Sequence, residues 1–429
     1  MIRAVATILR GSVFAQAIGF AILPLLSRNL QPEAFGHFQA FQAIIAFLLI
    51  AVTLRYEIAV LRAEDDEELA AILGLCGILM VGTTLLVSAG LLLADRVGWP
   101  AFLAKLGFPW WLLSLSMLAG GAAQLLGYVA TRAHAYGLVA NSKMAQAGLN
   151  AGVGAGLAWL APVSTTLILA DLAGRIGNLA WLARGTLEQI RSARAARWAG
   201  MRAAAIKFRD LSTISLPSTL LSTAGTSLTP LLIYASFDAA TSGQFGLVER
   251  SVGLPTALVV VAVSQVHMAH LATDIRTHGG EARRSFRRIA LLLGAGTLVP
   301  MAACILFATP LYRLVFGPGW EQAASFAQLM APAYWLSLIT GGINMTLTVV
   351  GRQKTQFAWD ASRFAAMALL WLTAPAAGWP IAWIVAAHSA LISFFSIALL
   401  VLSYRALPHG EASLGASDEG TARTAPDGL

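Results

Sequence analysis

Apolar residues fill the chain in long blocks, and each block is followed by a short polar segment. A block of about 20 helical residues is long enough to cross ~30 Å of hydrocarbon. Segments such as 70–94 are apolar on every face, whereas barrel strands would alternate apolar and polar residues. We therefore predict an all-α polytopic membrane protein of about twelve transmembrane helices, at residues 8–26, 37–55, 70–94, 110–131, 144–160, 162–183, 212–236, 244–270, 288–308, 323–349, 358–377 and 380–402.

Composition agrees with this pattern. Of the 429 residues, 57% are hydrophobic and only 12% are charged, and the mean hydropathy is +0.71. A chain with so little polar surface cannot cover a soluble globule of this size. Because the chain begins without a cleavable signal pattern, we expect the first span to stay in the membrane.

The distribution of Lys and Arg predicts the orientation, since cytoplasmic loops retain positive charge. With both termini in the cytoplasm, four of the 29 Lys and Arg fall outside and two within spans, and the other 23 face the cytoplasm. The net charge of +8 is explained by this topology, so no nucleic-acid partner is expected. The basic run from Arg184 to Arg209 either connects two spans or also lies on anionic lipid headgroups.

Two halves of the chain repeat one another. Pro24-Leu25-Leu26 followed by Gly36-His37-Phe38-Gln39 resembles Pro230-Leu231-Leu232 followed by Gly243-Gln244-Phe245-Gly246. Six helices per repeat give parallel repeats related by a pseudo-two-fold axis along the membrane normal, with a cavity between them. We predict a first six-helix lobe at 1–183, a basic cytoplasmic connector at 184–211, a second six-helix lobe at 212–402 and a disordered cytoplasmic tail at 403–429.

Polar residues inside the predicted spans are candidates for substrate contacts, because such groups are costly at membrane depth. By the repeat, Glu249 occupies the position of Gln42. Ser215, Ser218, Ser222 and Thr226 share one helix face, which is suited either to sugar hydroxyls or to tight helix packing. The candidate substrate-binding residues are Arg55, Arg250, Gln16, Gln39, Gln42, Glu249, Ser215, Ser218, Ser222 and Thr226.

Two of these candidates and one further pair have competing interpretations. Arg250 is either a ligand for an anionic group or the partner of Glu249 in a structural bridge. Asp171 and Arg175, four residues apart, form either a self-satisfied pair or a site for ion coupling. Gly148, Gly152 and Gly156 predict close helix packing on the fifth span.

The chemistry of an enzyme is missing from the sequence. It contains no G-x-x-x-x-G-K-[ST] loop, no G-x-S-x-G elbow and no metal-ligand cluster beyond His267 and His270. Cys76 and Cys304 lie inside predicted spans, so no disulfide framework is expected. We expect no cofactor, no metal and no catalytic residue.

Several segments resemble a known family. "LPLLSRNLQPEAFGHFQAFQAI", "LRYEIAV", "SGQFGLVERSVGLPTALV" and "VFGPGW" are similar to bacterial polysaccharide-type transporters, the Wzx-like flippases of the multidrug/oligosaccharidyl-lipid/polysaccharide superfamily. The similarity spans roughly residues 8–350. It implies a multi-pass protein of the bacterial inner membrane that flips a polyprenyl-pyrophosphate-linked oligosaccharide to the outer leaflet for capsule, O-antigen (lipopolysaccharide) or exopolysaccharide synthesis.

This resemblance assigns roles to the candidate residues. Arg55 and Arg250 suit the pyrophosphate, and the glutamines with the hydroxyl face suit the glycan. The implied partners are the lipid-linked oligosaccharide, membrane lipids and the polysaccharide polymerase machinery. Two alternatives stay open: a drug/cation antiporter of the same superfamily, in which Asp171 or Glu249 would bind the cation, and a membrane glycan polymerase or ligase.

Overall fold

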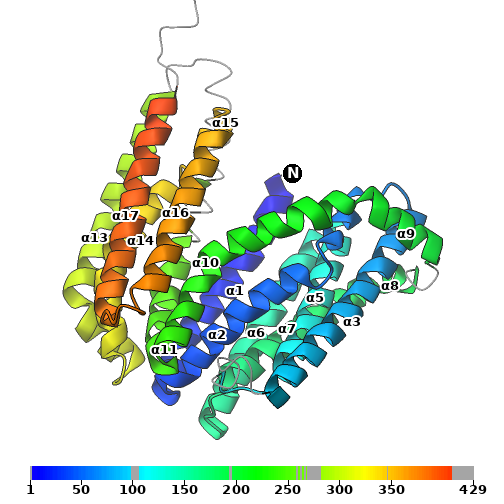
Figure 1. Ribbon diagram of the computed structural model, residues 1–429, viewed down its shortest axis with the longest axis horizontal. Coiled ribbons are helices and arrows are strands. Elements are labelled where there is room, and N and C mark those ends of the chain that lie inside the picture. The colour runs from blue at the N-terminus through cyan, green and yellow to red at the C-terminus, as the bar shows by residue number, and fades with distance from the viewer. Residues whose placement is uncertain are drawn as a thin grey trace, which may run out of the picture. The chain divides into compact units, whose positions relative to one another are not determined.

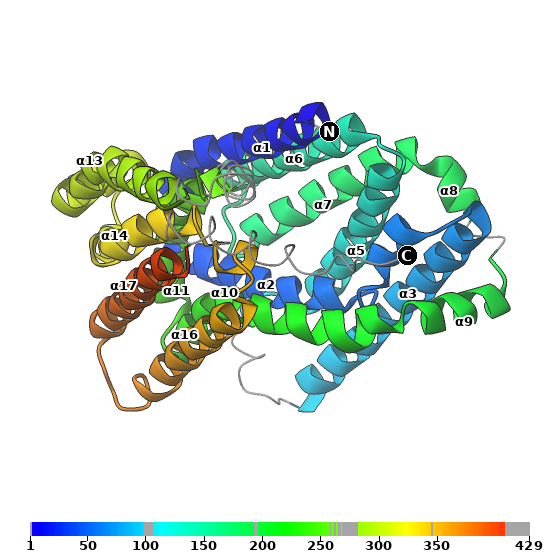
Figure 2. The same ribbon diagram turned by 90° about the horizontal axis from the view of Figure 1, so that it is seen from above.

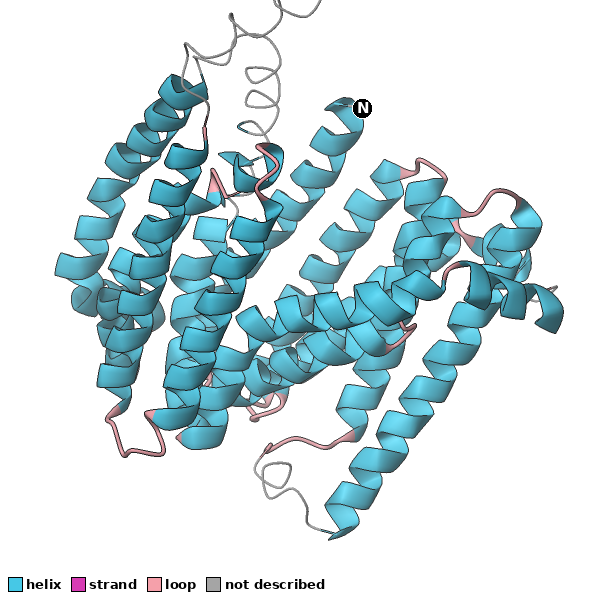
Figure 3. Cartoon of the chain, turned by 45° about the horizontal axis from the view of Figure 1, so that its top comes forward, coloured by secondary structure: helices cyan, strands magenta, loops and turns pink. Residues whose placement is uncertain are grey.

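The computed structural model describes residues 2–97, 106–192, 196–257, 259–260, 263–264, 267, 282–344 and 346–407. Across these residues the chain is helical, and no strand occurs among them (Figure 3). The fold is therefore that of an all-helical, multi-pass membrane protein, as the hydropathy pattern predicts. The tail from 408 onward and most of 258–281 lie outside the described residues.

Apart from the eighth span, the helices agree with the predicted spans to within several residues at each end. Of the eighth span, 244–270, part lies outside the described residues. The long helices are α1 (Ile2–Asn29), α2 (Pro32–Ala51), α3 (Asp66–Val97), α5 (Trp111–Arg132), α6 (Tyr136–Leu160), α7 (Thr166–Gly185), α10 (Leu216–Ser236), α13 (Ala282–Phe316), α14 (Glu321–Gly341), α16 (Gln353–Thr373) and α17 (Ile381–Ala406). Short helices are α8 (Leu187–Ser192), α9 (Trp198–Lys207), α11 (Ala239–Val248) and α15 (Thr346–Val349). Since α17 continues to Ala406, the expected start of the tail at 403 is too early.

Six described helices are long and apolar enough to cross a membrane by length and composition alone, among them α3 and α13. Others carry polar residues at their centre. α7, for example, contains Asp171, Arg175 and Asn178. Such helices cross a membrane only when these residues face protein or water.

Local geometry interrupts several predicted spans. α2 ends at Ala51 because the chain turns through Leu54 and Arg55, which have φ angles of 51° and 70°. A 3₁₀ helix, η1 (Tyr56–Arg62), follows. π-helical turns η3 (Leu211–Ser215) and η4 (Glu249–Gly253) lie at the start of α10 and at the end of α11. The predicted span 323–349 is divided into α14 and α15.

The helices form two compact units, which are described separately. The first unit contains residues 1–247 and 310–323, and the second contains 248–309 and 324–429. This division differs from the expected boundary at 183 to 212, because α10 and most of α11 pack with the N-terminal helices. The two six-helix lobes of the repeat stay a prediction.

In the first unit α6 packs on both α1 and α7, and α10 lies along α2 (Figures 1 and 2). α9 packs alongside α3. Lys207, at the end of α9, forms ion pairs with Glu64 and Glu68 at 2.8 and 2.6 Å. The prediction of close helix packing at Gly148, Gly152 and Gly156 of α6 is wrong. No described atom lies within 4 Å of a Cβ built on any of these three glycines. The close approach is made instead by α7, where a Cβ on Gly174 would lie 2.8 Å from the Gln146 carbonyl oxygen.

α2 and α11 cross even more closely at the glycines of the sequence repeat. A Cβ on Gly36 would lie 1.8 Å from the carbonyl oxygen of Ala239, and one on Gly243 would lie 1.8 Å from that of Pro32. Only glycine allows two helix backbones to approach in this way. The two motifs that repeat in the sequence therefore pack against each other, at helix ends that the orientation predicts to be outside.

In the second unit, hydrogen bonds and aromatic contacts join neighbouring helices. Trp335 Nε1 donates to the Gly294 carbonyl between α14 and α13 at 3.1 Å. Trp371 Nε1 donates to His388 Nδ1 between α16 and α17, also at 3.1 Å. These polar groups are paired within the protein, as a membrane interior requires.

Candidate functional site

A polar cluster follows the end of α2. Glu57 is buried, and it accepts hydrogen bonds from Thr53 Oγ1 and from Gln124 Nε2, the latter at 3.1 Å. Arg55 Nη1 lies 3.6 Å from Glu57 Oε1, while Arg55 Nε is buried without a described partner. Holding a non-glycine residue in the left-handed region costs of order 1–3 kcal/mol and is typical of functional sites. The turn at Leu54 and Arg55 thus holds the Arg55 guanidinium in place, and its Nε–H has no described acceptor.

Asp171 and Arg175 form the pair that their spacing favours. Arg175 Nε donates to Asp171 Oδ2 at 2.6 Å, and both side chains are largely buried. Arg175 Nη2 also donates to Gln42 Oε1 on α2 at 3.2 Å. Gln42, a sequence candidate for substrate binding, is therefore engaged by the protein itself through its amide oxygen.

A cavity of about 230 Å³ lies between α5, α6 and α7 in the first unit. Its lining residues are mostly small or polar: Gly120, Ala123, Gln124, Gly127, Val139, Ser142, Lys143, Gln146, Arg175, Asn178 and Leu182. Asn178 Nδ2 donates to Gln146 Oε1 at 2.8 Å, and Lys143 Nζ donates to Ser12 Oγ of α1 at 3.1 Å. None of Lys143, Gln124, Gln146 and Asn178 was a site candidate from the sequence.

The hydroxyl-rich face of α10 begins in the π-helical turn η3. Ser218 and Ser222 are exposed, and Ser215 is partly buried with its backbone carbonyl accepting from Thr219 Oγ1 at 2.8 Å. The side chain of Thr226 lies outside the described ones. Exposed serines along one helix face are compatible with the lining of a polar path, which is one of the two interpretations of the sequence pattern.

The other glutamine candidates occupy different settings. Gln16 Oε1 on α1 is buried without a described partner. Gln39 packs against α11, since a Cβ on Gly246 would lie 2.4 Å from Gln39 Cγ. Gln39 thus belongs to the glycine crossing of α2 and α11.

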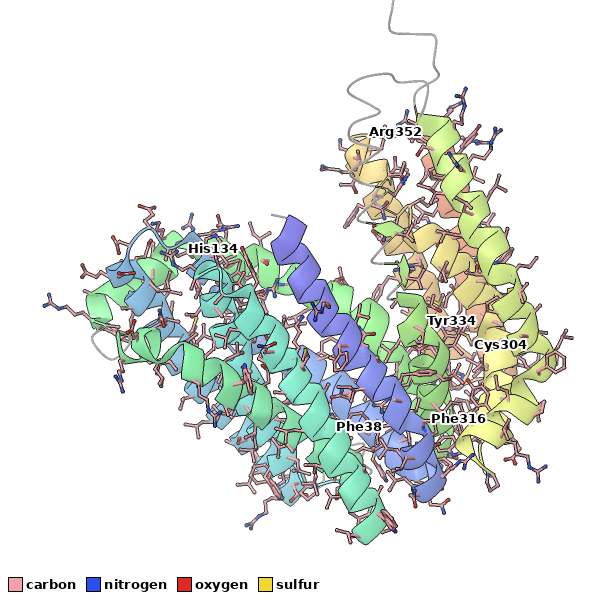
Figure 4. All side chains as sticks on the ribbon, turned by 180° about the vertical axis from the view of Figure 1, so that it is seen from behind. Phe38, His134, Cys304, Phe316, Tyr334 and Arg352 are labelled. Carbon is pink, nitrogen blue, oxygen red and sulfur yellow. The ribbon has the colours of Figure 1, made fainter. Side chains whose placement is uncertain are left out.

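In the second unit, Glu249 and Arg250 both lie in the π-helical turn η4. Tyr334 Oη of α14, labelled in Figure 4, donates to Glu249 Oε1 at 2.6 Å. π-turns inside α-helices are frequent at functional sites. The structure therefore gives Glu249 a protein partner and places Arg250 beside it on an irregular turn.

The remaining motif residues join residues 316–323 of the first unit to the end of α1 and to α11. Trp320 Nε1 donates to the Ser27 carbonyl at 2.9 Å, and Ser27 Oγ donates to the carbonyl of Phe316, labelled in Figure 4, at 3.1 Å. Gln244 Nε2 donates to the Gly319 carbonyl at 2.6 Å, and Gln244 Oε1 accepts from the Ala323 amide at 2.9 Å. The motifs "GQFG" and "FGPGW" are therefore explained by packing and hydrogen bonding.

Among the described residues, no group of three or more His, Cys, Asp or Glu side chains could hold a metal ion. His267 lies 3.4 Å from Thr346 Oγ1, while His270 is outside the described residues. Cys76 and Cys304 are free.

Comparisons with known structures show what the fold is similar to. The fold is similar to lipid II flippase MurJ in an inward closed conformation, with a TM-score of 0.68, 14% identity, and coverage of 92% of this chain and 86% of that one. It is also similar to an inward-facing multidrug resistance MATE family transporter of the MOP superfamily, with a TM-score of 0.59, 13% identity, and coverage of 91% and 94%. A third similar structure is a MATE transporter in complex with MaL6, with a TM-score of 0.53, 14% identity, and coverage of 95% of this chain and 95% of that one.

The family follows from the sequence match. Residues 25–325 match the family described as polysaccharide biosynthesis protein, and the chain belongs to that family. No curated protein matches the sequence significantly. The predicted resemblance is thus confirmed, and the structural neighbours named above are a flippase and multidrug-type transporters.

Proposed function

We propose that this protein moves a polyprenyl-pyrophosphate-linked oligosaccharide from the cytoplasmic to the outer leaflet of a bacterial inner membrane. The observation that carries the proposal is the family match over residues 25–325. A fold similar to that of a lipid II flippase supports it. The lipid tail can remain in the bilayer, so the protein must shelter only the polar head.

Arg55 and Arg250 are the residues proposed to bind the pyrophosphate. Arg55 has a buried Nε without a described partner, and Arg250 lies on an irregular turn inside a helix. Gln16 and Gln39, with Ser215, Ser218, Ser222 and Thr226, would contact the glycan. Gln42 and Glu249 would act mainly through their partners Arg175 and Tyr334.

Transport by alternating access requires that the two repeat lobes, 1–183 and 212–402, open to either side in turn. The glycine crossing of α2 and α11 would close the predicted outer end and would separate during release. The hydrogen bonds of Gln244 and Trp320 to their neighbours would re-form as the outer end closes.

The drug/cation antiporter is the second candidate, favoured by the likeness to a multidrug transporter fold. Such a protein needs a carboxylate for the cation. Glu57, Asp171 and Glu249 each already hold a hydrogen bond from a protein donor. The available donors of Arg55 and Lys143 fit an anionic substrate better.

Replacing Arg55 or Arg250 with glutamine is expected to abolish transport while the protein stays inserted and abundant, because the pyrophosphate needs charge rather than bulk. The test is complementation of a flippase-deficient strain, read as surface polysaccharide and as protein level. Arg405→Gln, an exposed arginine at the end of α17, is the matched control and should complement fully. Full complementation by both Arg55→Gln and Arg250→Gln would contradict the assignment.

A further inference from the structure

The cavity between α5, α6 and α7 has no role in the pyrophosphate binding proposed above. Lys143 lies seven residues from the start of α6, and Arg175 lies ten residues before the end of α7. At a rise of ~1.5 Å per residue, these groups are roughly 10 and 15 Å from helix ends that the orientation predicts to be cytoplasmic. The cavity therefore lies in the half of the first unit that a substrate from the inner leaflet would meet first.

The cavity has an excess of positive charge. Arg175 is compensated by Asp171 at 2.6 Å and is further engaged by Gln42. Gln124 donates to Glu57, which Arg55 faces at 3.6 Å. Lys143 donates to the hydroxyl of Ser12, and no ion pair joins it to a carboxylate in the described part of the chain. One ammonium group is thus left to attract an anion.

One residue that lines the cavity, Asn178, has an amide oxygen that lacks a donor. Asn178 Oδ1 is buried without a described partner, although Asn178 Nδ2 donates to Gln146. A buried acceptor of this kind costs free energy unless a ligand or water supplies a hydrogen. The diphosphate diester of the proposed substrate is fully ionised at neutral pH and has no hydrogen to donate, whereas a sugar hydroxyl does.

We propose that this cavity binds a carboxylate-bearing sugar of the transported glycan, with the carboxylate at Lys143 and a hydroxyl donating to Asn178. The inference rests on the proposed function and specifies its substrate class: an acidic oligosaccharide. A volume of about 230 Å³ holds about seven or eight waters at ~30 Å³ each, which is room for one pyranose ring. Gln146 Nε2 and the hydroxyl of Ser142 supply further polar groups around it.

The test measures, by ligand-observed NMR, the binding of D-glucuronate, D-glucose and inorganic phosphate to the full chain in detergent. Glucuronate is expected to bind about tenfold or more tightly than glucose, as one charge-assisted hydrogen bond provides. Lys143→Gln should remove that preference and Lys143→Arg should keep it. Lys354→Gln, an exposed lysine on α16, removes the same charge elsewhere and should leave binding unchanged.

Asn178→Asp tests the same site with a second variant if Lys143→Gln does not fold. A new carboxylate in the cavity should weaken glucuronate binding and leave glucose binding almost unchanged. The proposal is overturned if wild type binds both sugars equally, if phosphate binds as tightly as glucuronate, if no probe binds, or if Lys143→Gln keeps the preference. Translocation of lipid-linked substrate is measured separately, so loss of the sugar preference and loss of the flippase function are distinguishable.

Discussion

Replacing Gly243 with alanine is expected to remove most of the folded protein. The added Cβ would lie 1.8 Å from the Pro32 carbonyl oxygen and 2.9 Å from the Gly36 amide nitrogen, and real Cβ atoms stay beyond 3.0 Å. Both neighbours are helix backbone, so α2 and α11 must move apart. Overpacking typically costs about 1–3 kcal/mol and sometimes more. The measurement is the yield and thermal unfolding of the protein in detergent.

Gly148→Ala is the control for this change. It makes the same substitution inside α6, where no described atom lies within 4 Å of the new Cβ, and helix propensity favours alanine. We expect wild-type yield or slightly more. Equal unfolding temperatures for Gly243→Ala and Gly148→Ala would show that the crossing of α2 and α11 is not closely packed.

The charged pair on α7 gives the second large effect. Asp171→Asn or Arg175→Gln alone leaves one buried charge without its partner, which destabilises by about 3–5 kcal/mol. The double change removes both charges and leaves an uncharged helix that can still pack. We expect the double variant to recover the protein level that either single variant loses, and with it measurable transport.

A coupling site would behave differently, because a neutral pair carries no ion. In that case the double variant would be abundant but inactive, or its transport would no longer depend on the ion gradient. Protein level by immunoblot and polysaccharide export in the same cells separate these results. An abundant, inactive double variant would make Asp171 the first candidate for coupling.

The apolar spans were predictable because hydropathy sums over about 20 residues and tolerates local detail. The same sum does not report backbone conformation. The left-handed turn at Leu54 and Arg55 and the π-helical turns at 211–215 and 249–253 therefore had no signal in the pattern. The sequence also placed helix packing on Gly148, Gly152 and Gly156, whereas α7 packs through Gly174 and Gly177. Spacing shows which glycines share a face and not which neighbour that face meets.

The pairing of Asp171 with Arg175 could be predicted because four-residue spacing on one helix is local information. The cavity could not. Lys143, Gln146 and Asn178 are isolated polar residues on two helices, and they meet only after α6 and α7 pack. A search for single polar residues within apolar helices would have identified all three, but not their proximity.

We propose that the protein carries a lipid-linked oligosaccharide across the bilayer. The most direct measurement uses purified protein in liposomes that contain a polyprenyl-pyrophosphate oligosaccharide with an acidic sugar in one leaflet. Its appearance in the opposite leaflet is read by a membrane-impermeant glycosidase. We predict protein-dependent translocation that Arg55→Gln abolishes and Arg405→Gln preserves. Absence of translocation by folded protein that instead exchanges a cationic drug for protons or sodium would contradict the account.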